Sequence, residues 1–212
     1  MKKSAKTNSS KFSDIFSFIR PTEEIPTSQP RFAPSDIEPG TCCGMNIEHI
    51  DWPKGITHIG HDAFAHCENL KTAVIPDTVT LIGERAFTEC LSLNSITFSK
   101  RMSAIPLGCC AECLTLESVT IPSNIRTIGY GAFCKCLSLK QIIIPDGVNR
   151  IEEGTFSFCS QLETIYLPAS ITKIEEAVFY NCDALKEIIV PIGCKEKFAE
   201  WLPEQQQLIC EG

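Results

Sequence analysis

Apolar residues recur along this chain at intervals of 23 residues, from residue 44 to residue 192. One isoleucine column lies at Ile59, Ile82, Ile105, Ile128, Ile151 and Ile174. Phenylalanine follows at Phe64, Phe87, Phe133, Phe156 and Phe179. Cysteine and leucine complete the series at Cys67, Cys90, Cys113, Cys136, Cys159 and Cys182, and at Leu70, Leu93, Leu116, Leu139, Leu162 and Leu185. A fixed period of this length predicts a solenoid, because each repeat is one coil that only its neighbours can cover.

Each repeat predicts a short strand and a crossover. In the segment 139–145, Ile142 and Ile144 alternate with Ile143, so two of them face inward and one faces outward. The proline that follows has no N–H and ends the strand. Apolar residues three apart over residues 155–162 then predict one or two tight helical turns. Successive strands are therefore parallel, and their crossovers are expected to be right-handed.

The chain divides into three parts. Residues 1–41 are a basic segment and a proline-rich linker, with a short amphipathic helix predicted over residues 12–19. Residues 42–189 form the solenoid, as a half repeat and about six full repeats. Residues 190–212 break the period and form a C-terminal cap, in which 195–202 is helical and Leu208–Ile209 adds an edge strand.

Three sequence features resemble the BspA-like class of leucine-rich repeats. They are the I-P step, the I-G-x-x-A-F-x-x-C run at 82–90 and 128–136, and the closing L-x-x-I. The run V-P-x-G-C-K-E-x-F at 190–198 also resembles the tail of such proteins in gut bacteria. The resemblance implies an α/β-type leucine-rich repeat solenoid, with a short parallel β-sheet on the concave face and short helical turns or 3-10 segments on the other. It further implies a non-enzymatic protein that binds other proteins, commonly at the surface of a host-associated microbe.

The outward positions of the predicted strands are the candidate partner-binding residues. They form one column of mostly uncharged side chains, with Ile143, Tyr166 and Ile189 close together. An apolar patch that contains a tyrosine is a reasonable anchor for a protein partner, although a solvated β face is the alternative. The candidates on the concave face are Thr72, Val74, Thr97, Thr120, Gln141, Ile143, Thr164, Tyr166, Glu187 and Ile189.

Charge is unevenly distributed over the 212 residues, whose net charge is -7. Residues 1–31 hold six Lys/Arg against three Asp/Glu, and the remainder holds 13 against 23. An acidic body argues against nucleic-acid binding, which needs a basic face. No apolar run approaches the length of a membrane span.

The 13 cysteines indicate a reducing compartment, because six of them lie on the repeat period among core residues and the total is odd. Residues 1–20 lack the apolar run of a secretory signal, so we expect a cytoplasmic protein. Export by a route not visible in the sequence is the alternative.

Candidate reactive groups are few. Cys109, Cys110 and Cys134 lie near the cysteine column without a zinc-finger spacing. Cys110 replaces a column phenylalanine, and Leu107 is expected to fill the gap. The four histidines fall within one repeat but on different sides of the coil. No catalytic or phosphate-binding motif is present, so we expect no enzyme activity, cofactor or metal.

The sequence therefore favours a monomeric, non-enzymatic scaffold that binds a protein through its concave sheet. One alternative is a structural spacer whose N-terminal segment recruits the partner. Another is a surface adhesin of a host-associated microbe.

Overall fold

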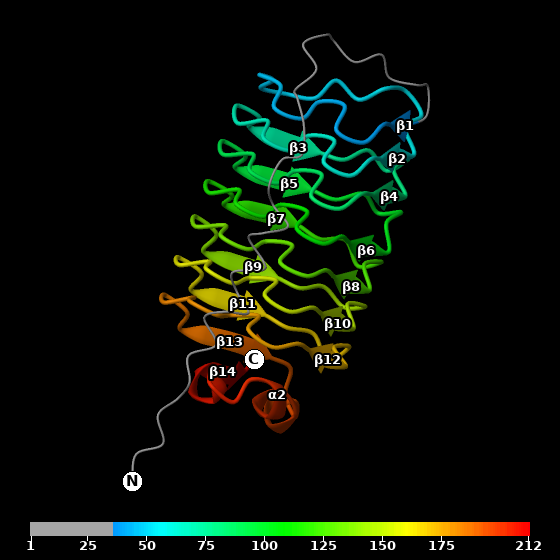
Figure 1. Ribbon diagram of the computed structural model, residues 1–212. Helices are drawn as coiled ribbons and strands as arrows, with labels where there is room; N and C mark the ends of the chain where they lie inside the picture. The colour runs from blue at the N-terminus through cyan, green and yellow to red at the C-terminus, as the bar shows by residue number, and fades with distance from the viewer. Residues whose placement is uncertain (1–35) are drawn as a thin grey trace.

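The chain folds as a stack of coils that carries two rows of parallel strands (Figure 1). The computed structural model describes residues 36–212. The first row, which we call the main sheet, consists of β3 (Thr72–Val74), β5 (Ser95–Thr97), β7 (Ser118–Thr120), β9 (Gln141–Ile143), β11 (Thr164–Tyr166), β13 (Glu187–Val190) and β14 (Ile209–Glu211). The second row consists of β1 (Asp36–Ile37), β2 (His58–Ile59), β4 (Leu81–Ile82), β6 (Ala104–Ile105), β8 (Thr127–Ile128), β10 (Arg150–Ile151) and β12 (Lys173–Ile174).

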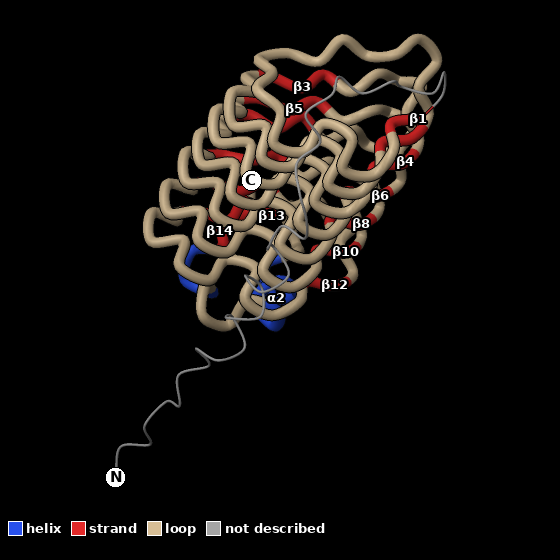
Figure 2. Tube along the Cα trace, turned by 45° about the horizontal axis from the view of Figure 1, so that its top comes forward, coloured by secondary structure: helices blue, strands red, loops and turns tan. Residues whose placement is uncertain are grey.

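The two rows lie on opposite sides of the stack, and turns connect them (Figure 2). Every strand pair in both rows is parallel, and equivalent residues of successive coils are paired, as Arg150 is with Thr127 and Lys173. The expected parallel-strand solenoid is therefore confirmed. The burial of alternate strand residues also agrees with the sequence pattern, since Ile142 is buried and Ile143 is exposed.

The expected helical turns are not formed within residues 36–190, and the second row of strands was not anticipated. In the turn after every second-row strand except β12, alternate amides donate to the next coil instead of to a local carbonyl. The Phe64 N–H donates to the Ala86 carbonyl at 2.8 Å, and the His66 N–H to the Thr88 carbonyl at 2.9 Å. His66 also has a positive φ of 57°, which a right-handed helix excludes. Hydrogen bonding between coils thus replaces hydrogen bonding along a helix.

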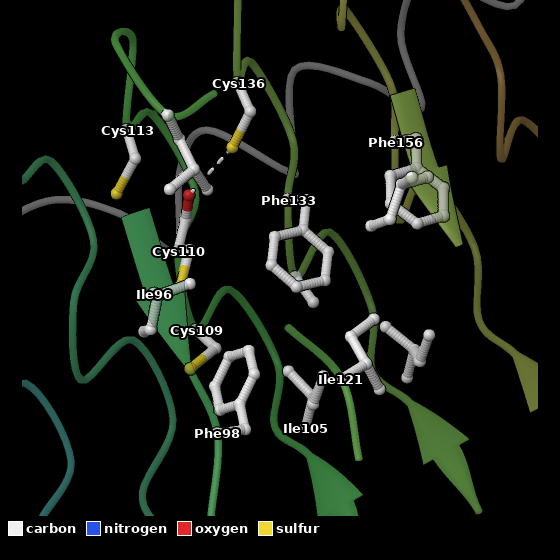
Figure 3. Close-up of a cluster of buried hydrophobic side chains, with 14 of the residues drawn as sticks. Ile96, Phe98, Ile105, Cys109, Cys110, Cys113, Ile121, Phe133, Cys136 and Phe156 are labelled. Atoms are coloured by element: carbon white, nitrogen blue, oxygen red, sulfur yellow. Dashed lines mark hydrogen bonds between the residues drawn. The ribbon is translucent and has the colours of Figure 1, made fainter. Parts of the chain in front are cut away.

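The core is built from the repeated columns. The Phe133 and Phe156 rings stack with their centroids 5.7 Å apart and an interplanar angle of 5°. Where Cys110 replaces a phenylalanine, Phe98 fills the space and meets Phe133 edge-on at 6.3 Å (Figure 3). Leu107, the residue expected there, is only half-buried. Phe98 can reach the space beside Cys110 because it belongs to the same coil, where it replaces the isoleucine of the I-P step.

The column cysteines have a hydrogen-bonding role that the sequence pattern did not reveal. The Cys159 thiol donates to the Phe133 carbonyl at 3.1 Å, and the Cys136 thiol donates to the Cys110 carbonyl at 3.3 Å. The same bond recurs from Cys67, Cys90, Cys113 and Cys182. Each thiol therefore satisfies a backbone acceptor of the preceding coil while it fills the core.

Both rows of strands are interrupted around the coil 98–120, at different places. The second row stops between β4 and β6 because Pro106 has no N–H. At this position Gly83 and Gly129 donate to the coil before them, at 2.7 and 2.8 Å. The main sheet stops between β7 and β9, where the backbone hydrogen bonds that join the other neighbouring strands are not formed in the described chain.

The two ends of the stack differ. The ladder starts at β1, before the boundary expected at residue 42, since Asp36 pairs with His58. The amphipathic segment 12–19 lies outside the described residues. At the C-terminus, α2 (Lys195–Trp201) and η1 (Gln206–Leu208) lead into β14, which pairs with β13. Phe198 of α2 is buried and belongs to the main hydrophobic core.

Candidate protein-binding face

The ten candidate residues all lie at outward positions of the main sheet. Val74, Ile143 and Tyr166 are large apolar residues that are 64%, 61% and 39% exposed. The remaining exposed members are Thr72, Thr120, Gln141 and Glu187, and the half-buried members are Thr97, Thr164 and Ile189. Their positions follow from the period of two along each strand, which places alternate residues on one face.

The register brings three of the apolar candidates together. Tyr166 of β11 pairs with Ile143 of β9 on one side and with Ile189 of β13 on the other. We call these three residues the apolar stripe. Directly paired positions lie within about 5.5 Å, so their side chains are in contact range. The stripe therefore presents one continuous apolar surface with a phenol hydroxyl at its centre.

The other candidates do not join the stripe. Val74 pairs with Thr97, which pairs with Thr120, so two threonines follow it along the sheet. The interruption between β7 and β9 then separates this group from the stripe. The structure thus divides the predicted column into a threonine-rich group and an apolar group.

A polar rim flanks the apolar stripe. A row of polar residues runs parallel to the stripe, two positions before it on each strand. The row consists of Gln141 on β9, Thr164 on β11 and Glu187 on β13. Beyond them Lys186 forms an ion pair with Glu163 at 2.9 Å. The hydrogen bond from Lys186 lowers the pKa of the Glu163 carboxyl. An apolar centre with a polar rim is the arrangement found in protein interfaces.

Cys210 is a neighbour of the candidate residues that the sequence pattern did not reveal. It lies on β14, pairs with Ile189 and is exposed, so it extends the surface beside the stripe. It was missed because the cap residues 190–212 are out of phase with the repeats. Only the prediction of an edge strand at Leu208–Ile209 pointed toward it.

The described histidines contact separate acidic residues in different parts of the coil. Within residues 36–212 no group of three His, Cys, Asp or Glu side chains is arranged to hold a metal ion. His58 contacts Asp36 at 2.8 Å, whereas His66 contacts Glu89 at 3.2 Å. Burial raises the pKa of the Cys159 thiol well above its ordinary value, which keeps it protonated and unreactive.

No helix in the described part of the chain is long and apolar enough to cross a membrane. All 13 cysteines are free, and most of them are buried.

Comparison with known proteins places these features in a family. The model of the BspA type leucine rich repeat region, six copies, matches residues 35–113 and 103–197. None of the curated proteins matches the sequence.

Solved structures show the same fold. A leucine-rich repeat protein from Bacteroides ovatus is 29% identical, with a TM-score of 0.58, and the match covers 74% of this chain and 46% of that one. One from Eubacterium ventriosum is 26% identical with a TM-score of 0.60, covering 70% and 43%. The Treponema pallidum leucine rich repeat protein shares the fold at 20% identity and a TM-score of 0.52, covering 81% and 73%. This chain thus spans about half the length of the first two.

Proposed function

This chain belongs to the family of BspA type leucine-rich repeat proteins, and we propose that it is a non-enzymatic scaffold that binds another protein through its main sheet. The apolar stripe is the observation that carries this proposal. Ile143 and Tyr166 expose large apolar surface, lie in register and are flanked on one side by a row of polar residues. Tyrosine is enriched among the residues that dominate binding energy in protein interfaces.

The partner is a folded or extended protein surface that places apolar side chains over Tyr166. The rigid strands keep the stripe in place, so little conformational entropy is lost when the partner binds. The free energy then comes mainly from burial of apolar area.

Two alternatives of a different class make different predictions. A structural spacer would recruit its partner through residues 1–40 and would not depend on the main sheet. A surface adhesin would require export, whereas we propose a reducing compartment on the support of the free cysteines. Fractionation of the native cells, with antibody detection, distinguishes the two locations.

The direct test compares affinity capture from native cells by three proteins. They are the wild type, the Ile143→Ser and Tyr166→Ala double variant, and a Thr72→Ser and Val74→Ser control on the other part of the main sheet. All the substituted side chains point outward, so circular dichroism and thermal melting should match among the three.

We expect the stripe variant alone to lose the captured protein. A captured protein is then purified and titrated against each variant, and we expect its Kd to rise at least about tenfold with the stripe variant only. Retention by the stripe variant, with loss only on deletion of residues 1–40, would refute the main-sheet proposal and favour the spacer.

A further inference from the structure

The main sheet has an open strand edge at the C-terminal end of the stack. β14 pairs with β13 on one edge, and no other strand within residues 36–212 pairs with it (Figure 1). The opposite end of the sheet is different, because the chain at residues 45–50, next to β3, forms no strand. There the Lys71 N–H donates to the Glu48 carbonyl at 3.1 Å. In the described chain, the main sheet therefore presents a regular strand edge at its C-terminal end alone.

The hydrogen-bonding groups of β14 alternate between its two edges. In a parallel sheet, alternate residues of a strand direct their N–H and C=O groups toward the same neighbour. The Gly212 N–H donates to β13 at 3.0 Å, so Gly212 and Cys210 face β13. Ile209 and Glu211 then face the open edge. The Ile209 N–H donates locally to the Gln206 carbonyl, which leaves the Ile209 C=O and the Glu211 N–H directed outward.

The open edge lacks the features that usually prevent strand pairing. Natural edge strands are protected by proline, by projecting charged side chains or by bulges. β14 has a single charge, and its Glu211 carboxylate is held against the cap. It accepts hydrogen bonds from the Gly193 N–H at 2.8 Å and from the Lys195 N–H at 3.2 Å. Of the other two residues, Ile209 is buried and Cys210 is exposed but uncharged, so the edge is unprotected.

A second copy of this chain fits the open edge in one arrangement. Head-to-tail addition would need a strand edge at the other end of the main sheet, where residues 45–50 form no strand. Two β14 strands related by a two-fold axis instead run antiparallel and close the assembly as a dimer. With the axis at Cys210, the Glu211 N–H of each copy donates to the Ile209 carbonyl of the other copy. The outward groups of the two strands are thus complementary, while the Ile209 N–H keeps its local bond.

We propose that two copies of the chain pair antiparallel through β14, so that the main sheet continues across a two-fold axis at Cys210. The two Cys210 residues then form a pair without mutual hydrogen bonds, with Cα atoms about 4.5 Å apart. Cys210 follows Ile189 on the face of the apolar stripe, so the stripes of the two copies join into one row. The proposal does not rest on the function of the stripe, because backbone groups of β14 make the contact.

The first experiment measures self-association of the full chain by sedimentation velocity, under reducing conditions and over a range of protein concentrations. It compares the wild type with Glu211→Pro and Glu211→Ala. Proline removes the outward N–H without removing a hydrogen bond to β13, and edge strands tolerate it at such a position. Both variants lose the carboxylate that bonds to Gly193 and Lys195, so alanine is the matched control.

We expect the wild type and Glu211→Ala to dimerise. Glu211→Pro should raise the Kd of the dimer at least about tenfold, because two hydrogen bonds per dimer are lost. Added salt should tighten the dimer, since each copy carries a net charge of -7. Tyr166→Ala should dimerise like the wild type even where it loses a captured protein, which separates this proposal from the function of the apolar stripe.

The second experiment uses Cys210 to report the register. Of the 13 cysteines, all of which lie in the described chain, Cys210 alone is exposed. Oxidised glutathione should take two electrons and two protons from the paired thiols and leave as two molecules of glutathione, while one Sγ–Sγ bond forms. The Cα separation of about 4.5 Å lies within the range of disulfides. Peptide mapping should find Cys210 linked to Cys210, and Cys210→Ala should give no covalent dimer.

A chain that stays monomeric at every concentration would overturn the proposal, and would be the result if a strand of another protein occupies the edge. Equal dimerisation of the two Glu211 variants would also overturn it, because the outward N–H would then make no contribution. So would a disulfide through another cysteine, which would place the contact elsewhere. Growth beyond the dimer would exclude the two-fold arrangement, since that arrangement closes the assembly.

Discussion

At the scale of single residues, the column cysteines combine two roles that are usually assigned to different side chains. Each thiol fills the core like a small hydrophobe and also donates to a carbonyl of the preceding coil. A buried acceptor that has lost its donor is unfavourable, because it has also lost water. The cysteine column therefore contributes to the joining of successive coils as well as to packing.

Replacing Cys159 with alanine tests the thiol bond. The change removes a buried sulfur and its bond to the Phe133 carbonyl, which keeps only the Cys136 N–H as donor. We expect the free energy of unfolding, measured in urea, to fall by about 1–3 kcal/mol. Cys210→Ala, at an exposed position, is the matched control and should stay within about 0.5 kcal/mol of wild type. Equal stabilities of the two variants would contradict this role.

The buried thiols also predict how stability depends on pH. Burial raises the pKa of Cys67, Cys134 and Cys182 from 9.0 to about 12. Because the folded pKa lies above the unfolded one, the stabilisation is complete below pH 9 and is lost as the pH rises toward 12. Each such thiol should lower the free energy of unfolding by about 1.4 kcal/mol per pH unit in that window.

Urea unfolding at pH 7.5, 9, 10 and 11 measures this slope. Cys182→Ala should remove about 1.4 kcal/mol per pH unit from it between pH 9 and 11. An unchanged slope in this variant would show that the Cys182 thiol is not responsible.

At the scale of elements, the residue directly after each second-row strand sets how closely that strand approaches the coil before it. A Cβ atom on Gly83 would lie 2.2 Å from the His61 nitrogen, and one on Gly60 would lie 2.4 Å from the Pro39 nitrogen. Pro106, Glu152 and Glu175 occupy the same position in later coils. Glycine is therefore required at positions 60 and 83, although three later coils carry larger residues at the equivalent position.

Gly83→Ala should therefore be strongly destabilising. The added methyl group meets backbone atoms that can move only with the whole coil, so we expect a loss of about 1–3 kcal/mol. The matched control is Glu152→Ala, at the equivalent position, where a Cβ is already accommodated. Thermal melting that shows equal effects for both variants would contradict the close approach.

The elements also show how far sequence pattern reaches. The main-sheet strands were predictable because short runs of β-branched residues end at a proline, as Ile142, Ile143 and Ile144 do before Pro145. The second row was not, because apolar residues three apart suit a helical turn and the observed turn equally. Hydrogen bonds to the next coil decide between the two, and their partners lie in another repeat.

The candidate site was predictable in its members but not in its grouping. The column from Thr72 to Ile189 followed from the period, as did the proximity of Tyr166 to Ile143. The column is divided into two groups by the interruption between β7 and β9. No single residue in the sequence indicates this interruption. Two contacts could not be predicted because they depend on distances between coils, which a sequence pattern does not contain. They are the contact of Phe98 with Phe133 and the pairing of Cys210 with Ile189.

At the scale of the whole molecule, the stack should be least protected where the main sheet is interrupted. The Ile144 N–H donates to the Tyr166 carbonyl at 2.9 Å, but the equivalent Ile121 N–H lacks this bond to Ile143 within residues 36–212. Native-state hydrogen exchange should therefore be at least about tenfold faster at Ile121 than at Ile144. Equal protection of the two amides would show that β7 and β9 pair in solution.

The coil 98–120 is held to its two neighbours by different sides of the stack. Toward the N-terminus it is joined through β5 and β7, and toward the C-terminus through β6 and β8. Turn bonds such as that from Gly108 to Tyr130, at 2.9 Å, continue through this level. The rod therefore has a soft joint near its middle, where bending strains fewer bonds than elsewhere. We expect a force that bends the stack to deform this coil first. The apolar stripe and the threonine-rich group would then tilt relative to each other while the coils on either side keep their shape.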